Sequence, residues 1–132
     1  LFTLKEIQIP KILLHYSLTN IIFPITIETF NFIFLWDCDL GYINFLPLSG
    51  ASMTDIKLYD NNMSVDEVNH ILVDFDNIST NLNPTGWAGT TLNITGTNAA
   101  PNDGTGGGGG YDGLAALSSL TGATNNWTIT TS

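Results

Sequence analysis

Residues 53–63 read MTDIKLYDNNM, and residues 30–40 read FNFIFLWDCDL. The two stretches start 23 residues apart, and both place apolar residues at their first, fourth, sixth and last positions, with Asn or Cys ninth. This is the pattern L-x-x-L-x-L-x-x-N/C-x-L, which recurs with a period of about 20–29 residues in one class of repeat protein. We therefore interpret the echo as a repeat period rather than as chance recurrence of Ile and Leu. The matching residues are Phe30, Ile33, Leu35, Cys38 and Leu40, then Met53, Ile56, Leu58, Asn61 and Met63.

Three other stretches match the pattern less completely. Residues 4–14 supply the apolar positions 26 residues before the second copy, but Ile12 replaces the Asn or Cys. Residues 90–98 pair Leu92 with Ile94, and residues 125–132 pair Trp127 with Ile129. We count the stretch at the start as a third good copy and the last two as degraded copies.

The pattern has a physical meaning. Its central L-x-L is a short strand whose alternate side chains point inward, and the following Asn turns the chain by bonding backbone groups that would otherwise be unpaired. One unit cannot bury its own apolar face, so successive units stack and their strands pair in parallel. These arguments predict an α/β fold, a leucine-rich-repeat-like solenoid with short parallel strands.

The repeat register predicts which side chains of FNFIFLW face outward. A shift by one residue would bury Phe32, Phe34 and Trp36, whereas the repeat places Ile33 and Leu35 inside. Lys57 and Tyr59 follow in the next row, so the candidate binding surface comprises Phe32, Phe34, Trp36, Lys57 and Tyr59. Exposed aromatic clusters mark binding surfaces. We expect a docking patch for a protein or a glycan; the alternative is that a preceding segment or a neighbouring protomer covers these residues as core.

The second half of the chain changes style. Residues 64–67 form a capping box, Ser64-x-x-Glu67, and predict a helix over about 65–77 with one apolar stripe. A second helix is expected from Asp112 to Gly122, with Leu114, Leu117 and Leu120 as its buried stripe. We expect strands at TLNIT and WTITTS, so both helices are crossover connections between parallel strands.

This reading divides the chain into two parts. We expect residues 1–63 to hold about three irregular leucine-rich repeats. Residues 64–132 are expected to form helix, strand, helix and strand as the C-terminal repeats or cap, with a flexible Gly-rich loop at 101–113. The chain has no initiator Met, and we expect it to be one end of a longer protein.

Composition excludes several classes of partner. The net charge is −9, the only basic residues besides two histidines are Lys5, Lys11 and Lys57, and there is no Arg. Such a surface argues against binding to nucleic acid and to anionic membranes. No run of 18 apolar residues occurs, so we expect no transmembrane helix. The single cysteine, Cys38, excludes an intrachain disulfide.

No catalytic signature is evident, and we expect a protein that is not an enzyme and carries no cofactor and no metal. His15 and His70 lack partners at ligand spacing, and Asp37 with Asp39 lacks the later ligands of a calcium loop. The run of five glycines from Gly106 has no following Lys and so does not match a phosphate loop. A polysaccharide-degrading enzyme is a third hypothesis, for which no carboxylate pair stands out.

Three segments carry a resemblance to a known group of proteins. They are DIKLYDNNMSVDEVNHILVDFDN, GTTLNITGTNAAP and YDGLAALSSLTGATNNWTITTS. Residues 54–132 closely resemble the terminal leucine-rich segments of phage and related virion proteins, although the GTGGGGG insert and the NPTGWAG loop depart from that pattern. The resemblance implies a virion-surface structural or host-attachment protein, tail- or fibre-associated, whose partners are other virion proteins, copies of itself, or a host-surface protein or glycan.

Similar segments also occur in bacterial surface proteins. The alternative is therefore a secreted or cell-surface bacterial adhesin that binds protein or glycan. Four glycosylation sequons, at Asn62, Asn77, Asn93 and Asn126, matter only in a glycosylating host and reflect composition.

Overall fold

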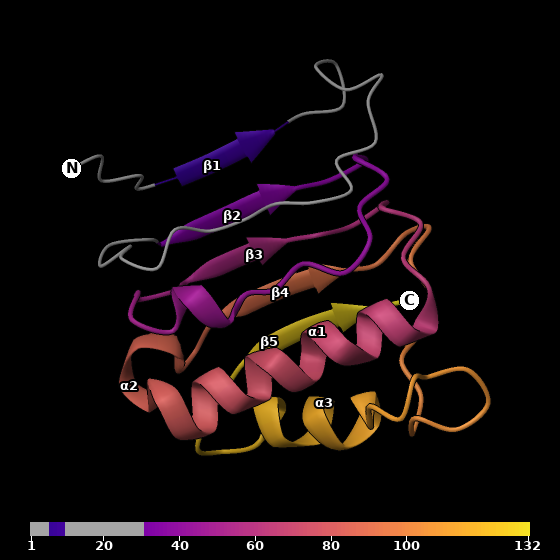
Figure 1. The fold of residues 1–132 in the computed structure, drawn as a ribbon. Helices are drawn as coiled ribbons and strands as arrows, with labels where there is room; N and C mark the ends of the chain where they lie inside the picture. Colours follow the sequence, from indigo (N-terminus) through magenta and orange to yellow (C-terminus); the bar gives the residue numbers. More distant parts are fainter. Residues whose placement is uncertain (1–5, 10–30) are drawn as a thin grey trace.

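The computed structural model describes residues 6–9 and 31–132, and for residues 6–9 it describes the backbone. Its centre is a five-stranded parallel sheet in which every strand pairs with the next strand in chain order. Figure 1 shows this sheet from β1 to β5. The strands are β1 (Glu6–Ile9), β2 (Phe32–Leu35), β3 (Asp55–Lys57), β4 (Thr91–Ile94) and β5 (Thr128–Thr131). The mixed α/β class with short parallel strands is therefore confirmed.

The strand register agrees with the sequence pattern. One continuous row across the sheet consists of Ile7, Ile33, Ile56, Leu92 and Ile129. Ile33 and Leu35 are completely buried, so the register that places them inside is correct and the shift by one residue is excluded. The rest of the first copy, apart from residues 6–9, lies outside the described residues.

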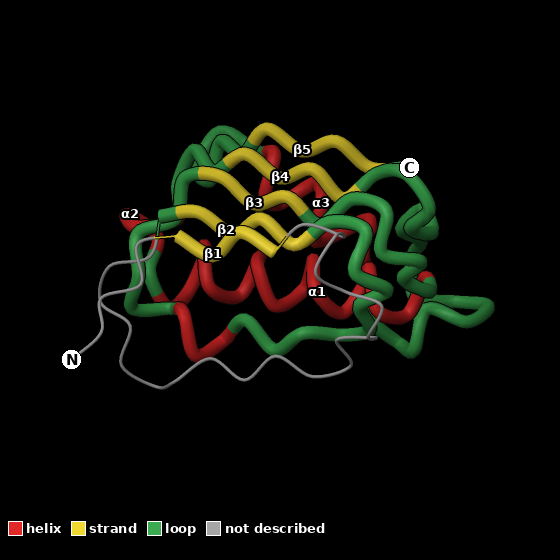
Figure 2. Tube along the Cα trace, turned by 90° about the horizontal axis from the view of Figure 1, so that it is seen from above, coloured by secondary structure: helices red, strands yellow, loops and turns green. Residues whose placement is uncertain are grey.

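Two helices connect strands in the C-terminal half, as predicted. α1 (Val65–Asn77) follows β3, and α3 (Gly113–Thr121) joins β4 to β5. Figure 2 shows the sheet as one layer and both helices as a second layer on the same side of it. Between β2 and β3 the chain crosses in irregular structure with a short 3₁₀ helix, Leu46–Leu48.

The ends of α1 and α3 match the predicted caps. Ser64 Oγ accepts a hydrogen bond from the Glu67 N–H, and Glu67 Oε2 accepts one from the Ser64 N–H at 2.8 Å. Asp112 Oδ1 accepts from the Ala115 N–H at 2.8 Å, and Gly122 follows the last turn of α3. These side chains bind amide groups that the first turn of a helix leaves unpaired.

The predicted apolar stripe of α3 is wrong. Leu114 is 48% exposed, and the buried residues of the helix are Gly113, Ala116 and Leu120. Gly113 lies against Asn69 of α1, where even a Cβ would overlap the Asn69 amide. The small residues let the two helices approach closely, and this turns the larger Leu114 away from the core.

An aromatic cluster fills the space between the sheet and the helices. The Phe75 ring lies 4.8 Å from Phe45 and 5.5 Å from Trp127, centroid to centroid, and Trp127 stacks on Trp87 at 6.1 Å. Trp87 is completely buried. It belongs to a segment that we expected to be a loop, but which forms a π-helical turn, Ile78–Leu82, and the short helix α2 (Pro84–Trp87). Within the described part of the chain, no helix is long and apolar enough to cross a membrane.

Candidate functional site

The outer face of the sheet brings the predicted binding residues together. Phe32 and Phe34 project from β2 with ring centroids 6.0 Å apart, and Trp36, just beyond the strand, lies 6.4 Å from Phe34. Phe32 is 37% exposed, and Phe34 and Trp36 are half-buried. The pleat causes this arrangement, because alternate residues of a strand project from the same face.

The next strand completes the surface. Tyr59 stacks on Trp36 with centroids 5.9 Å apart and ring planes 18° from parallel. The Lys57 ammonium lies 4.2 Å from the centroid of the Phe34 ring and 3.4 Å from a carboxylate oxygen of Asp55. We call the group Phe32, Phe34, Trp36, Lys57 and Tyr59 the aromatic face.

The chemistry of the outer surface changes from β3 to β5. Beyond Lys57, the β4 side carries Asn93 and Thr95, whose side chains bond to each other at 2.7 Å. The last strand presents Thr128 and Thr130, which are exposed. An apolar aromatic area is thus bordered by hydroxyl and amide groups, an arrangement suited to binding.

Buried amides position the turn beside the aromatic face. Asn61 Oδ1 accepts a hydrogen bond from the Cys38 N–H at 2.9 Å, and Asn61 Nδ2 donates to the carbonyls of Leu35 and Leu58, both at 2.8 Å. The Asp37 N–H donates to the Tyr59 carbonyl at 3.1 Å. These bonds hold Trp36 and Tyr59 at a fixed separation. The role that the pattern gave to its ninth residue is therefore confirmed for Asn61.

Asn98 repeats this role in the following turn. Its side-chain oxygen accepts from the Asn61 N–H at 3.0 Å, and its nitrogen donates to the Leu58 carbonyl at 2.8 Å. The backbone is left-handed at Asp37 and Asp39 and again, 23 residues later, at Asp60 and Asn62. Asp and Asn tolerate this conformation better than most residues, which accounts for the acidic turn that sequence comparison with calcium loops brought out.

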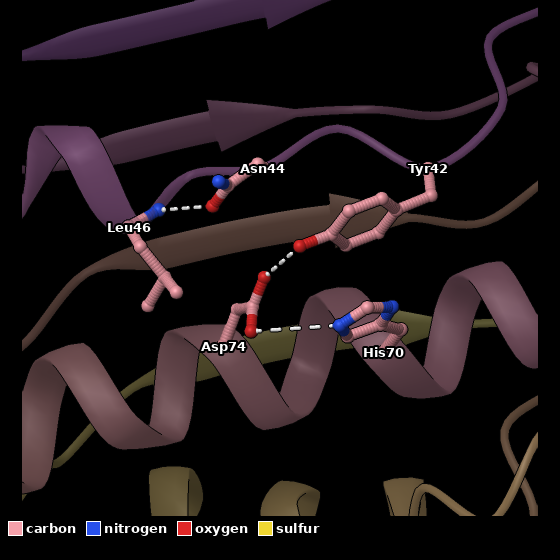
Figure 3. A network of polar contacts seen from close by, with 5 residues as sticks. All are labelled: Tyr42, Asn44, Leu46, His70 and Asp74. Atoms are coloured by element: carbon pink, nitrogen blue, oxygen red, sulfur yellow. Dashed lines mark hydrogen bonds and ion pairs between the residues drawn. The ribbon is translucent and has the colours of Figure 1, made fainter.

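A second cluster, on the helical side of the sheet, was missed by sequence reasoning. The His70 ring lies between Tyr42 and Tyr111, with centroid distances of 3.9 Å and 3.8 Å and nearly parallel planes. The Tyr42 hydroxyl donates to Asp74 Oδ2 at 2.6 Å, and His70 Nε2 lies 3.9 Å from Asp74 Oδ1 (Figure 3). We call these four residues the histidine cluster. Only the spacing of His70 and Asp74 on one helix face signals it in the sequence.

Burial shapes the titration of this cluster. Removal from water raises the pKa of the Asp74 carboxyl above its ordinary value, although the Tyr42 hydrogen bond and the His70 ring lower it in part. Burial and the adjacent Asp74 carboxylate also raise the pKa of the Tyr42 hydroxyl, which therefore remains a hydrogen-bond donor. The cluster is thus a tight structural contact that joins three segments distant in sequence.

The Gly-rich loop is bonded to α1, contrary to the expected flexible excursion. Asn69 Nδ2 donates to Asn102 Oδ1 at 2.7 Å and to the Tyr111 carbonyl at 2.8 Å, and the Asn102 N–H donates to Asn69 Oδ1 at 3.0 Å. Gly108 is buried within the loop. The paired amides hold both ends of the loop, so its glycines permit close packing and left-handed turns rather than simply adding flexibility.

The described residues contain no group of three or more His, Cys, Asp or Glu side chains placed to hold a metal ion. His15 lies outside the described residues. The Cys38 thiol is buried, burial raises its pKa, and it donates to the Trp36 carbonyl at 3.0 Å. This thiol therefore serves the turn that follows β2.

Comparison with known proteins finds no family model, no curated protein and no solved structure that matches the chain. The site is accordingly defined by its own geometry: the aromatic face on the outer side of the sheet and the histidine cluster on the helical side.

Proposed function

We propose that this chain is a non-enzymatic module of a virion surface protein, tail- or fibre-associated, that contacts a neighbouring virion protein through the aromatic face. The observation that carries the proposal is the stacking of Trp36 on Tyr59 beside the exposed Phe32 ring. The link to virions comes from the resemblance of residues 54–132.

We further propose that the fold is the end of a leucine-rich-repeat-like solenoid. Strands in strict chain order, one continuous row of inward residues and the linked amides of Asn61 and Asn98 support this reading. In such an array each unit contacts its neighbours, and one side of the sheet remains available to a partner.

The composition of the aromatic face suits a protein interface. Interface cores are enriched in aromatic residues and depleted of charge, and a few aromatic anchors contribute most of the binding energy. Lys57 is held over Phe34 and beside Asp55, so its charge is partly balanced within the chain. An apolar partner surface with a few hydrogen-bond donors fits this face best.

The second candidate is a bacterial adhesin that binds a glycan. It is favoured by the row of hydroxyl and amide groups beside the aromatic face, at Asn93, Thr95, Thr128 and Thr130. Sugar hydroxyls would bond to such groups while a sugar ring packed against an aromatic edge.

Mass spectrometry of purified particles from the source would test the proposal. We expect the chain to accompany capsid and tail proteins at a fixed copy number. We also expect the Trp36→Ala/Tyr59→Ala variant to be lost from the particles, because truncating an aromatic anchor costs about 2 kcal/mol or more of binding free energy. Leu82→Ala is the matched control, since Leu82 is 52% exposed and lies in the π-helical turn, outside the aromatic face.

Two results would contradict the proposal. Retention of the double variant at the wild-type copy number would show that the aromatic face is not the assembly contact. Recovery of the chain in the cell-surface fraction, with none in particles, would favour the adhesin.

A further inference from the structure

The last part of the chain is uncharged. The protein carries a net charge of −9, yet residues 113–132 contain no Asp, Glu, Lys, Arg or His. This stretch comprises α3 and β5, which form the end of the two-layer structure farthest from β1 (Figures 1 and 2). A surface that lacks charge in so acidic a protein is suited to contact with another protein.

β5 is an edge strand of the described sheet. The Thr128 N–H donates to the Thr90 carbonyl at 3.0 Å, on the β4 side. Because backbone groups of successive strand residues point in opposite directions, those of Ile129 and Thr131 point away from β4. Proteins usually protect such an edge with Lys, Pro or a bulge, and Thr128–Thr131 has none of these.

Burial is also incomplete at this end. In the row of inward residues, Ile33, Ile56 and Leu92 are completely buried, whereas Ile129 is only partly buried. On α3, Leu114 is 48% exposed. The end of the structure thus combines an unprotected strand edge with apolar side chains that a partner would cover.

We propose that a second copy of this chain covers this end, with its β5 antiparallel to the first β5 across a two-fold axis. The contact brings together two uncharged surfaces, so the acidic parts of the two copies stay apart. A two-fold contact uses the same residues on both sides and closes after two copies. The result is a continuous ten-stranded sheet with both α3 helices on the same side.

The strand chemistry selects one register. Residues directly opposite each other must point to the same face, so the axis passes through either Ile129 or Thr130. An axis at Ile129 would place Trp127 opposite Thr131, but the Trp127 N–H already donates to the Leu120 carbonyl at 3.0 Å. An axis at Thr130 pairs Ile129 with Thr131 of the second copy and leaves each outward-pointing backbone group with a partner.

Sedimentation equilibrium of the full chain over a range of concentrations tests this dimer. We expect a mass twice the 14.3 kDa of the chain. Thr130 is exposed and faces its own copy, so Thr130→Lys and Thr130→Asp should each sediment at half the wild-type mass, because like charges oppose each other. An equal mixture of the two variants should regain the dimer mass. Thr91→Lys, an exposed position on the interior strand β4, is the control and should remain dimeric.

Two outcomes would overturn the proposal. One is a wild-type chain that stays monomeric at every concentration, which would mean that the end face has another occupant or none. The other is a dimer that the Thr130 variants do not dissociate. This test is independent of the aromatic face, because Trp36→Ala/Tyr59→Ala should lose virion incorporation and keep the dimer mass.

Discussion

The side-chain oxygen of Asn61 lies 2.9 Å from the backbone nitrogen of Cys38, 23 residues earlier in the chain, and accepts its hydrogen bond. The same side chain donates to carbonyls on both sides of the turn, and Asn98 in turn binds the Asn61 backbone. One amide therefore ties successive strand-turn units together. Asn serves here because it carries both a donor and an acceptor.

Replacing Asn61 with Ala should strongly destabilise the protein. The Cys38 N–H and the Leu35 and Leu58 carbonyls would lose their partner, and each unpaired buried group costs about 1–3 kcal/mol. We expect a loss of about 3 kcal/mol or more in the free energy of unfolding, measured by urea denaturation. Asn81→Ala, at an exposed position, should change it by about 0.5 kcal/mol or less. Equal losses in both variants would contradict the linking role of Asn61.

The histidine cluster should behave as a stacking contact. His70→Ala removes two ring contacts, each worth about 0.5–1.5 kcal/mol, so we expect a loss of about 1–3 kcal/mol in unfolding free energy. His70→Phe keeps a ring between Tyr42 and Tyr111 and should recover most of that loss. If Phe is no better than Ala, the contact depends on the imidazole nitrogens and Asp74 instead.

Gly108 should be required for the fastening of the Gly-rich loop. A Cβ there would overlap Asn102 Oδ1 and lie 2.6 Å from Asn69 Nδ2 and 2.7 Å from the Gly104 backbone. We expect Gly108→Ala to break the paired amides and to increase hydrogen exchange at the backbone amide of Asn102. Gly106→Ala meets open space and carries only the cost of a left-handed backbone, about 1 kcal/mol. Its exchange at Asn102 should stay at the wild-type rate, and unchanged exchange in both variants would refute the requirement.

Asp74 should make the protein less stable as pH rises. Burial raises the folded-state pKa of this carboxyl above its ordinary value of 3.8, so the folded state binds the proton more tightly than the unfolded state. The resulting stabilisation is complete below 3.8 and is lost as pH rises through the folded-state pKa. Asp74→Asn keeps an oxygen acceptor for Tyr42 without the charge. We therefore expect it to gain stability relative to wild type as pH rises.

Unfolding free energies from about pH 3 to about pH 6 would measure this trend. Asp103→Asn gives a comparison of opposite sign, because hydrogen bonds from Thr105 lower the pKa of Asp103. Its wild-type contribution is present above 3.8 and lost as pH falls, so this variant should lose stability relative to wild type as pH rises. A flat difference for Asp74→Asn would show that its charge is well solvated in the folded state.

Local pattern was sufficient to predict the strands and helix ends. The 23-residue echo identified Ile33 and Ile56 as register partners, and Ser64 with Glu67 identified the start of α1. Both signals act over a few residues, since strand alternation and capping depend on near neighbours. The same alternation predicted that the five residues of the aromatic face would share one surface.

The histidine cluster and the bonded loop could not be predicted in this way. Tyr42 and Tyr111 lie in irregular segments with no periodic signal, and Asn69 meets Asn102 across 33 residues. Leu114 followed the helical period and is exposed, because the close approach of Gly113 to α1 set the rotation of α3.

The sequence by itself therefore determined the parallel strands, their register, the helix caps and the outward aromatic row, because each follows from spacing along the chain. Only the tertiary structure decided which face of α3 is buried, how the glycines of the loop are used, and that Ile129 remains partly covered at an uncharged strand edge. These depend on contacts between distant segments, which packing selects and local spacing does not encode.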